Sequence, residues 1–195
     1  MSRLMKHALA IAGLSLTMPL LAQPTVWQID RDHSTALFTV RHLGVSNIHG
    51  SFAKVSGTVT LDDADTSKSS VNATIDTTSI STDNENRDKD LRSDHFFDTA
   101  KFPAMTFQSK KVMSAGGKTQ VLGTLTLHGV SKDVNLDVEG SSKEVTAMGK
   151  QRRGYTATTT INRRDFGLTY GGNLPSGDAM VGDDVKITLE VELTK

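Results

Sequence analysis

Histidine is the residue type best placed to do chemistry in this chain, which has six histidines and no cysteine. His33, His42 and His49 lie near one another in the sequence, but they form neither a His-x-His pair nor the helical i, i+4 pair of a zinc site, so we expect no metal. His42 follows Phe38 and Val40 in strict alternation, which predicts an imidazole on the inward face of a strand. Three roles stay open for it: a structural hydrogen bond, contact with the polar head of a ligand, or an acid or base.

Other chemical motifs are weak. The segment Gly44 to Asn47 lacks the second glycine of a hydrolase nucleophile elbow. The stretch Gly171 to Gly177 is rich in glycine but opens no helix, which indicates a flexible loop and not a phosphate cradle. Three arginines stay ambiguous, with a solvated surface position as the default; they are Arg41, Arg163 and Arg164. We therefore expect no enzyme activity.

Length and charge narrow the class further. The chain has 195 residues, enough for one ordinary domain, and 22 basic residues balance 22 acidic ones. The densest basic cluster is Lys150 to Arg153, which is too small for a nucleic-acid surface. We expect no nucleic-acid partner.

Most of the chain alternates apolar and polar residues with the period of two that strands require. Eight such strands are predicted, after a short one at 26–29, in the segments 34–43, 51–61, 71–75, 105–115, 121–127, 134–138, 155–161 and 185–193. The last is the clearest, with a dry face from Val185 to Leu193 and a wet face opposite. Phe52 falls on the wrong parity of its segment, which predicts either a nearby bulge or an outward Phe52.

Eight strands with short turns predict an all-β antiparallel barrel, and a two-sheet sandwich would also satisfy the pattern. The barrel is favoured because small residues are interspersed with the large ones on the inward face; they are Gly57, Ala73, Gly123, Ala157 and Thr159. A barrel of about eight strands either just fills its interior or holds one small ligand. The small residues favour a roomy interior.

One stretch, residues 82–107, breaks the alternation between the third and fourth strands. Its charged first half predicts a short helix with Asp83 as N-cap and two acid-first pairs four residues apart, Glu85 with Lys89 and Asp88 with Arg92. Four of the seven phenylalanines follow within twelve residues, at Phe96, Phe97, Phe102 and Phe107. A polar helix before an apolar cluster is typical of a cap over a cavity, with Leu91 and the first two phenylalanines as its inner lining. Whether these aromatic residues fill a core or line a ligand site stays open.

The N-terminus has the features of an export signal. Arg3 and Lys6 precede an apolar run from Ala8 to Ala22, which is shorter than the ~20 residues of a membrane-spanning helix. We expect residues 1–22 to be a cleaved signal peptide and residues 23–195 to form a single barrel domain. Export of a cysteine-free chain with a bacterial-type leader indicates the periplasm.

Several separated motifs, in order along the mature chain, resemble those of the YceI-like family. They are Asp32-His33-Ser34 with Phe38, Arg41-His42-Leu43-Gly44 and Gly50-Ser51-Phe52, then Asn86-Arg87-Asp88 to Leu91 with Phe96-Phe97-Asp98, Phe102-Pro103 and Thr106-Phe107, then Gly123 to Lys132, Asn162 to Gly167 and Val181-Gly182-Asp183. The resemblance implies a lipocalin-like eight-stranded antiparallel β-barrel in the periplasm that binds a polyisoprenoid or similar long amphiphile without catalysis. It implies no cofactor beyond that bound lipid.

The ligand-lining residues follow from parity and position. We expect them to be Phe38, Val40, His42, Val59, Ala73, Ile75, Leu91, Phe96, Phe97, Phe107, Leu125, Tyr155 and Ala157. The ligand would be an isoprenoid of the quinone or prenyl phosphate type, or alternatively a fatty acid or its amide. An enzyme that uses His42 on a lipid-like substrate and a purely structural protein with a filled barrel are the competing hypotheses. The oligomeric state stays open, with a dimer among the alternatives, and after signal cleavage we expect at most transient contact with a membrane.

Overall fold

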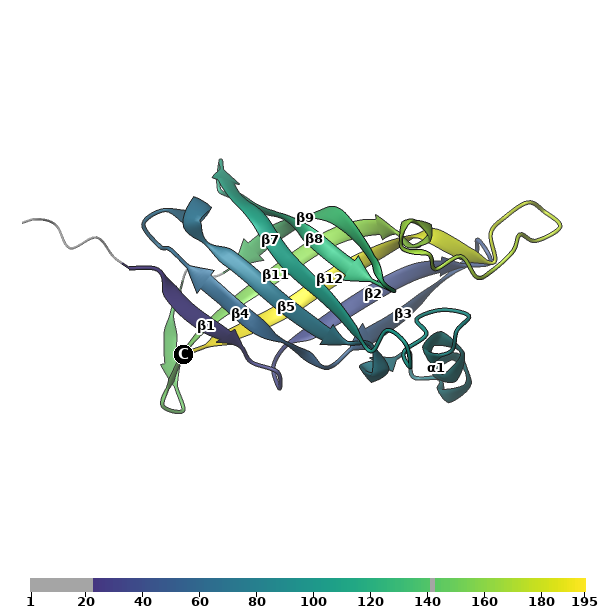
Figure 1. The fold of residues 1–195 in the computed structure, drawn as a ribbon, viewed down its shortest axis with the longest axis horizontal. Helices are drawn as coiled ribbons and strands as arrows, with labels where there is room; N and C mark the ends of the chain where they lie inside the picture. The colour runs from purple at the N-terminus through teal and green to yellow at the C-terminus, as the bar shows by residue number, and fades with distance from the viewer. Residues whose placement is uncertain (1–22, 141–142) are drawn as a thin grey trace, which may run out of the picture.

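Residues 23–140 and 143–195 fold into one highly twisted, closed sheet with a single α-helix at one end (Figure 1). The computed structural model describes residues 23–140 and 143–195, so the predicted signal peptide lies outside the described residues. The strands are β1 (Thr25–Ile29), β2 (Thr35–His42), β3 (Ser46–Phe52), β4 (Val55–Leu61), β5 (Ser70–Asp76), β6 (Ile80–Ser81), β7 (Ala104–Ala115), β8 (Lys118–Leu127), β9 (Val130–Gly140), β10 (Val145–Ala147), β11 (Lys150–Asn162) and β12 (Val181–Thr194). The helix is α1 (Glu85–Arg92), and three short 3-10 turns are η1 (Thr66–Lys68), η2 (Thr77–Ser79) and η3 (Arg163–Phe166).

Eight of these strands form a closed ring. Neighbours pair antiparallel in the order β11-β9-β8-β7-β5-β4-β1-β12, and β12 pairs back onto β11 to close it. The prediction of an eight-stranded antiparallel barrel with one short helix is confirmed. The helix lies between β5 and β7, where the break in alternation placed it.

One predicted strand is divided in the structure. β1 and β2 both pair antiparallel with β12. β4 pairs with β1 and β3 pairs with β2, so β2 and β3 extend the sheet beyond the ring. The predicted strand at 51–61 is therefore wrong, because Ala53 and Lys54 separate β3 from β4. Phe52 belongs to β3, pairs with the inward Ala36 and is 5% exposed. The expectation of a bulge or an outward Phe52 is also wrong, because the alternation of inward and outward residues ends with β3 and begins again with β4.

The seams of the ring differ in length. β11 and β12 pair over eleven residues each, from Arg152 with Thr194 to Asn162 with Asp184. β9 and β11 pair over only four, from Tyr155 with Gly140 to Thr158 with Asp137. The rest of β9 continues alongside β8 alone.

Two of the small inward residues do not leave open space. A Cβ on Gly123 would lie 2.4 Å from Cζ of Phe107, because the ring of Phe107 packs onto this glycine. Gly57 has a φ of 143°, and its Cβ would lie 2.1 Å from the carbonyl oxygen of Asn72 on the paired strand. Both glycines therefore admit a neighbour closely instead of widening the interior.

The helix begins one residue later than predicted. Asn84 is its N-cap, with a side-chain oxygen that accepts a 3.0 Å hydrogen bond from the backbone N–H of Arg87. Asp83 has a left-handed φ of 57°, which turns the chain into the helix and takes its side chain away from the capping position.

The charges of α1 attach it to the chain before it. Asp88 is 7% exposed and accepts from the backbone N–H of Thr82 at 2.8 Å and from its Oγ1 at 2.5 Å. Arg87 donates to the same hydroxyl, and Arg92 donates to the backbone carbonyls of Thr78 and Ile80. The carboxylate of Asp88 and the guanidinium of Arg92, predicted to pair with each other along the helix, instead hold the helix against β6 and η2.

Replacement of Asp88 by alanine is expected to destabilise the protein by about 1–3 kcal/mol, because it leaves the buried N–H of Thr82 without a partner. The free energy of unfolding measured by chemical denaturation checks this. Asp94→Ala, at an exposed position just after the helix, is the matched control and should change stability by less than about 0.5 kcal/mol. Equal effects of the two variants would contradict the anchoring role.

Candidate ligand cavity

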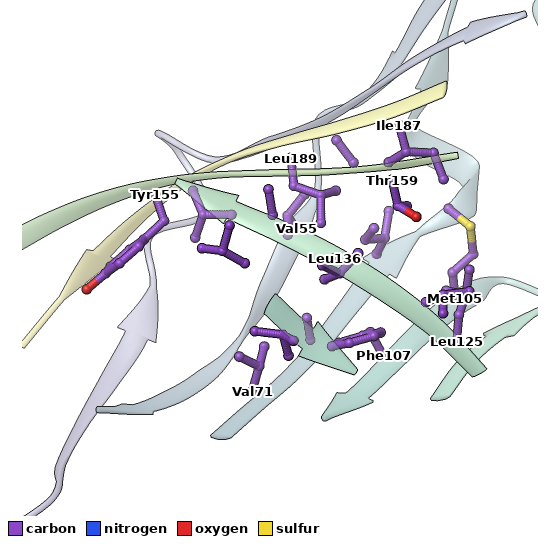
Figure 2. Close-up of a pocket in the computed structure, with 18 of the residues that line it drawn as sticks. Val55, Val71, Met105, Phe107, Leu125, Leu136, Tyr155, Thr159, Ile187 and Leu189 are labelled. Atoms are coloured by element: carbon purple, nitrogen blue, oxygen red, sulfur yellow. The ribbon is translucent and has the colours of Figure 1, made fainter. Parts of the chain in front are cut away.

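A cavity of about 540 Å³ runs inside the barrel and is walled mainly by apolar side chains (Figure 2). In Figure 2, Tyr155 lies at one end of this space and Met105 at the other, with Leu136, Val55 and Leu189 between them. Ligand pockets in proteins typically measure ≈ 300–1,000 Å³. The size and lining fit one small apolar ligand.

The strict alternation of β12 builds one side of this wall. Every second residue from Val185 to Leu193 lines the cavity, while the residues between them belong to the outer face. The eight steps between these two residues span about 26 Å at roughly 3.3 Å per residue. The cavity is therefore elongated along the strands, which suits a chain-like ligand better than a compact one.

Twelve of the thirteen residues predicted from parity lie in the cavity wall. They are Phe38, Val40, Val59, Ala73, Ile75, Leu91, Phe96, Phe97, Phe107, Leu125, Tyr155 and Ala157. The structure thus brings them together around one space, and their contact with a ligand stays a prediction.

His42 is the exception, and its predicted position near the cavity is wrong. Parity holds along β2 through Phe38 and Val40, which pair with Ile187 and Val185. Beyond Val40 the pairing with β12 shifts register, and His42 pairs with Val181 at the end of the strand. Among the described residues no histidine lines the cavity.

One cluster outside the cavity wall has the atoms of a metal site. Ligand atoms of Asp30, His33 and Glu192 lie within 4.8 Å of one another. The guanidinium of Arg152 already bonds to both carboxylates, at 3.1 Å from Asp30. Burial raises the pKa of Asp30, but hydrogen bonds from His33, the Asp32 backbone and Arg152 outweigh it and hold the pKa below its usual value. Arg152 thus supplies the positive charge that these carboxylates need.

We call one end of the cavity the helix end, defined by Leu91, Phe96 and Phe97. The ring of Phe97 packs edge-on against Phe52 at 5.5 Å between centroids. Phe96 packs on Tyr170 of the glycine-rich loop at 5.0 Å. The segment after α1 and this loop together cover the helix end, as the sequence predicted for the three lining residues.

Arg163 also lies at this end and is only 4% exposed, so its expected surface position is wrong. Its guanidinium donates to the backbone carbonyls of Leu168, Tyr170, Val181 and Gly182. Burial lowers the pKa of Arg163, while Asp183, 3.3 Å away, opposes the shift. Arg163 thus joins the glycine-rich loop to the start of β12 through hydrogen bonds, a role that no local sequence pattern reveals.

The opposite end, which we call the Arg153 end, is the polar one; its wall includes Asp62, Asp63, Thr66, Ser69 and Arg153. Arg153 forms a two-pronged ion pair with Asp63 at 2.7 and 2.8 Å and reaches Glu144 at 3.3 Å. The hydrogen bond to Asp63 raises the pKa of Arg153, and the same bond lowers the pKa of Asp63. Sequence reasoning missed Arg153, although it shares the parity of Tyr155 and Ala157 on β11.

With the cavity defined, comparison with known proteins identifies its family. A model of the YceI-like domain matches residues 27–193. The chain belongs to the YceI-like family. A UPF0312 protein of Vibrio parahaemolyticus is 38% identical over 174 residues, which cover 87% of this chain and 92% of that protein. The protein YceI of Salmonella arizonae is 38% identical over 145 residues, 73% of this chain and 76% of the relative.

Several solved structures have the same fold. The YceI protein of Campylobacter jejuni is 34% identical, superposes with a TM-score of 0.66 and covers 80% of this chain and 89% of its own. BcnA of Burkholderia cenocepacia gives a TM-score of 0.71 at 24% identity, with 84% and 98% coverage. A polyisoprenoid binding domain from Saccharophagus degradans gives 0.62 at 21% identity, with 86% and 97% coverage. In this YceI-like chain, no helix within residues 23–140 and 143–195 is long and apolar enough to cross a membrane.

Ala157→Trp should obstruct the cavity, because Ala157 is buried in its wall between Val121, Leu136 and Leu189. If the cavity holds a long-chain lipid, we expect the variant to retain at most about a tenth of the amount bound by the wild type, with a loss of stability of about 1–3 kcal/mol from overpacking. Lipid retention after gel filtration and a thermal melt measure the two effects.

Thr160→Trp is the matched control, since Thr160 is an exposed residue on the same strand. It should bind lipid as the wild type does. Full lipid loading of Ala157→Trp in a folded protein would show that this face does not hold the ligand.

Proposed function

We propose that this protein is a non-catalytic periplasmic carrier that holds one long-chain isoprenoid lipid, of the quinone or prenyl phosphate type, inside the barrel. The observation that carries the proposal is the elongated apolar cavity of about 540 Å³ with strictly alternating walls. The Saccharophagus degradans neighbour, described as a polyisoprenoid binding domain, supports the choice of ligand class. The periplasmic location rests on the leader sequence in residues 1–22.

Simple energetics favour a long tail. Burial of ten methylene-sized groups contributes roughly 8 kcal/mol, while association costs ~4 to 15 kcal/mol. A short tail would therefore bind weakly. Forty such groups would sum to about 32 kcal/mol, beyond the roughly 18 to 21 kcal/mol at which affinity saturates, so a very long tail has to bend or remain partly outside.

The competing hypotheses fit the cavity less well. A filled structural barrel would leave room for a few waters, each of which needs only about 10–15 Å³. An enzyme that uses His42 loses its acid or base, because that imidazole lies outside the cavity wall. A fatty acid or its amide would occupy the same apolar wall, so direct identification of the ligand has to separate these lipids from isoprenoids.

Organic extraction of the protein purified from the periplasm, followed by mass spectrometry, is expected to yield an isoprenoid lipid at up to one molecule per chain. Ala157→Trp purified in parallel distinguishes cavity-bound lipid from surface carry-over. Recovery of fatty acids or amides instead would reassign the ligand. Repeated absence of any lipid, together with no binding of added isoprenoids, would falsify the carrier function.

Replacement of His42 by alanine should leave lipid loading unchanged, because the side chain does not line the cavity. The lipid recovered from His42→Ala should also match the wild-type lipid in mass. A changed lipid mass or a lost turnover of the bound lipid would restore the enzyme hypothesis.

A further inference from the structure

Both arginines in the cavity wall are already neutralised by the protein. The guanidinium of Arg163 is committed to four backbone carbonyls and lies 3.3 Å from Asp183. The terminal nitrogens of Arg153 face Asp63 and Glu144. Neither side chain has a free positive charge to offer an anion inside the cavity.

Carboxylates outnumber these arginines. Asp62 is a second acid in the wall at the Arg153 end, where it is 7% exposed and accepts from the backbone N–H groups of Ala64 and Asp65. The ammonium of Lys195 lies 4.0 Å from Glu144 and thus shares a carboxylate that Arg153 also contacts. The polar end of the cavity is therefore not a cationic site.

Within residues 23–140 and 143–195, this end offers the cavity one unpaired hydrogen-bond donor, the Nε of Arg153. The Nε of Arg153 and the Nε1 of Trp27 are both buried and have no hydrogen-bond partner among the described residues. The two side chains are in contact, with the guanidinium carbon of Arg153 5.1 Å from the centre of the indole ring. Trp27 is 1% exposed and lies outside the cavity wall, whereas Arg153 lines the cavity, so the Nε of Arg153 is the donor that a ligand can reach. A buried donor without a partner is destabilising, and a ligand oxygen that accepts from it would relieve that destabilisation.

We propose that the cavity selects a lipid whose head is uncharged and carries a hydrogen-bond acceptor, such as a quinone carbonyl, an amide or an alcohol, and that this head lies at the Arg153 end. The inference rests on the proposed carrier function and narrows its ligand class. A diphosphate head would bring further negative charge to a site where carboxylates already exceed cations, and a buried charge without a partner is strongly unfavourable. The tail extends from there along β11 and β12 toward the helix end.

Two ligands with the same C20 tail test this, geranylgeraniol and geranylgeranyl diphosphate, titrated at one detergent concentration and about 0.15 M salt. We expect the alcohol to bind at least about tenfold more tightly. Trp27 is the only tryptophan, so its fluorescence reports directly on the Arg153 end. Binding of the alcohol should change this emission.

Asp63→Asn is the decisive variant. It removes one carboxylate, so the positive charge of Arg153 loses its bidentate partner. The preference for the alcohol should fall by about fivefold or more. The side chain of Asp63 is 66% exposed, so we expect the variant to fold. Asp133→Asn is the control, since Asp133 pairs with Lys110 outside the cavity wall and its removal should leave the preference unchanged.

Three results would overturn the inference. They are equal or tighter binding of the diphosphate by the wild type, an unchanged preference in Asp63→Asn, and tight binding of the alcohol without any change in Trp27 emission. If neither ligand binds and extraction yields no lipid, the carrier function itself fails and the inference fails with it. If extraction identifies a bound isoprenoid but the alcohol shows no preference, only the head-group inference fails.

Discussion

The structure depends on the closure of its sheet through β12. This strand pairs with β11 along one edge and with β1 and β2 along the other, so each of its edges has a partner. Closure satisfies backbone hydrogen bonds from strand to strand and does not require the interior to be filled. A chain without cysteine can therefore keep a hollow core and still fold cooperatively.

Most of the buried core forms the cavity wall itself. Of the 17 buried apolar residues in the part of the chain that the structure describes, only Trp27, Ile80 and Phe166 do not line the cavity. Two arginines hold the ends of the cavity. Arg163 bonds to backbone carbonyls at the helix end, and Arg153 forms an ion pair at the Arg153 end. The same buried apolar side chains therefore stabilise the barrel and bound its cavity.

Alternation predicted the barrel and most of its wall because a two-residue period fixes the face of every residue within an unbroken strand. It failed where the strand itself is interrupted, as at Phe52 beside the break at Ala53 and Lys54, and at His42 beyond the register shift in β12. Such interruptions depend on partner strands distant in sequence. The burial of Arg163 could not be predicted for the same reason. The carbonyls that accept its hydrogen bonds come from the following loop and the start of β12.

The short seam between β9 and β11 makes the two edges of β11 unequal in strength. Only four residue pairs join these strands, against eleven between β11 and β12. Separation of β11 from β9 therefore breaks fewer backbone hydrogen bonds than separation of β11 from β12. β11 is thus held firmly to β12 and less firmly to β9, so the ring widens more easily on the β9 side of this strand than on its β12 side.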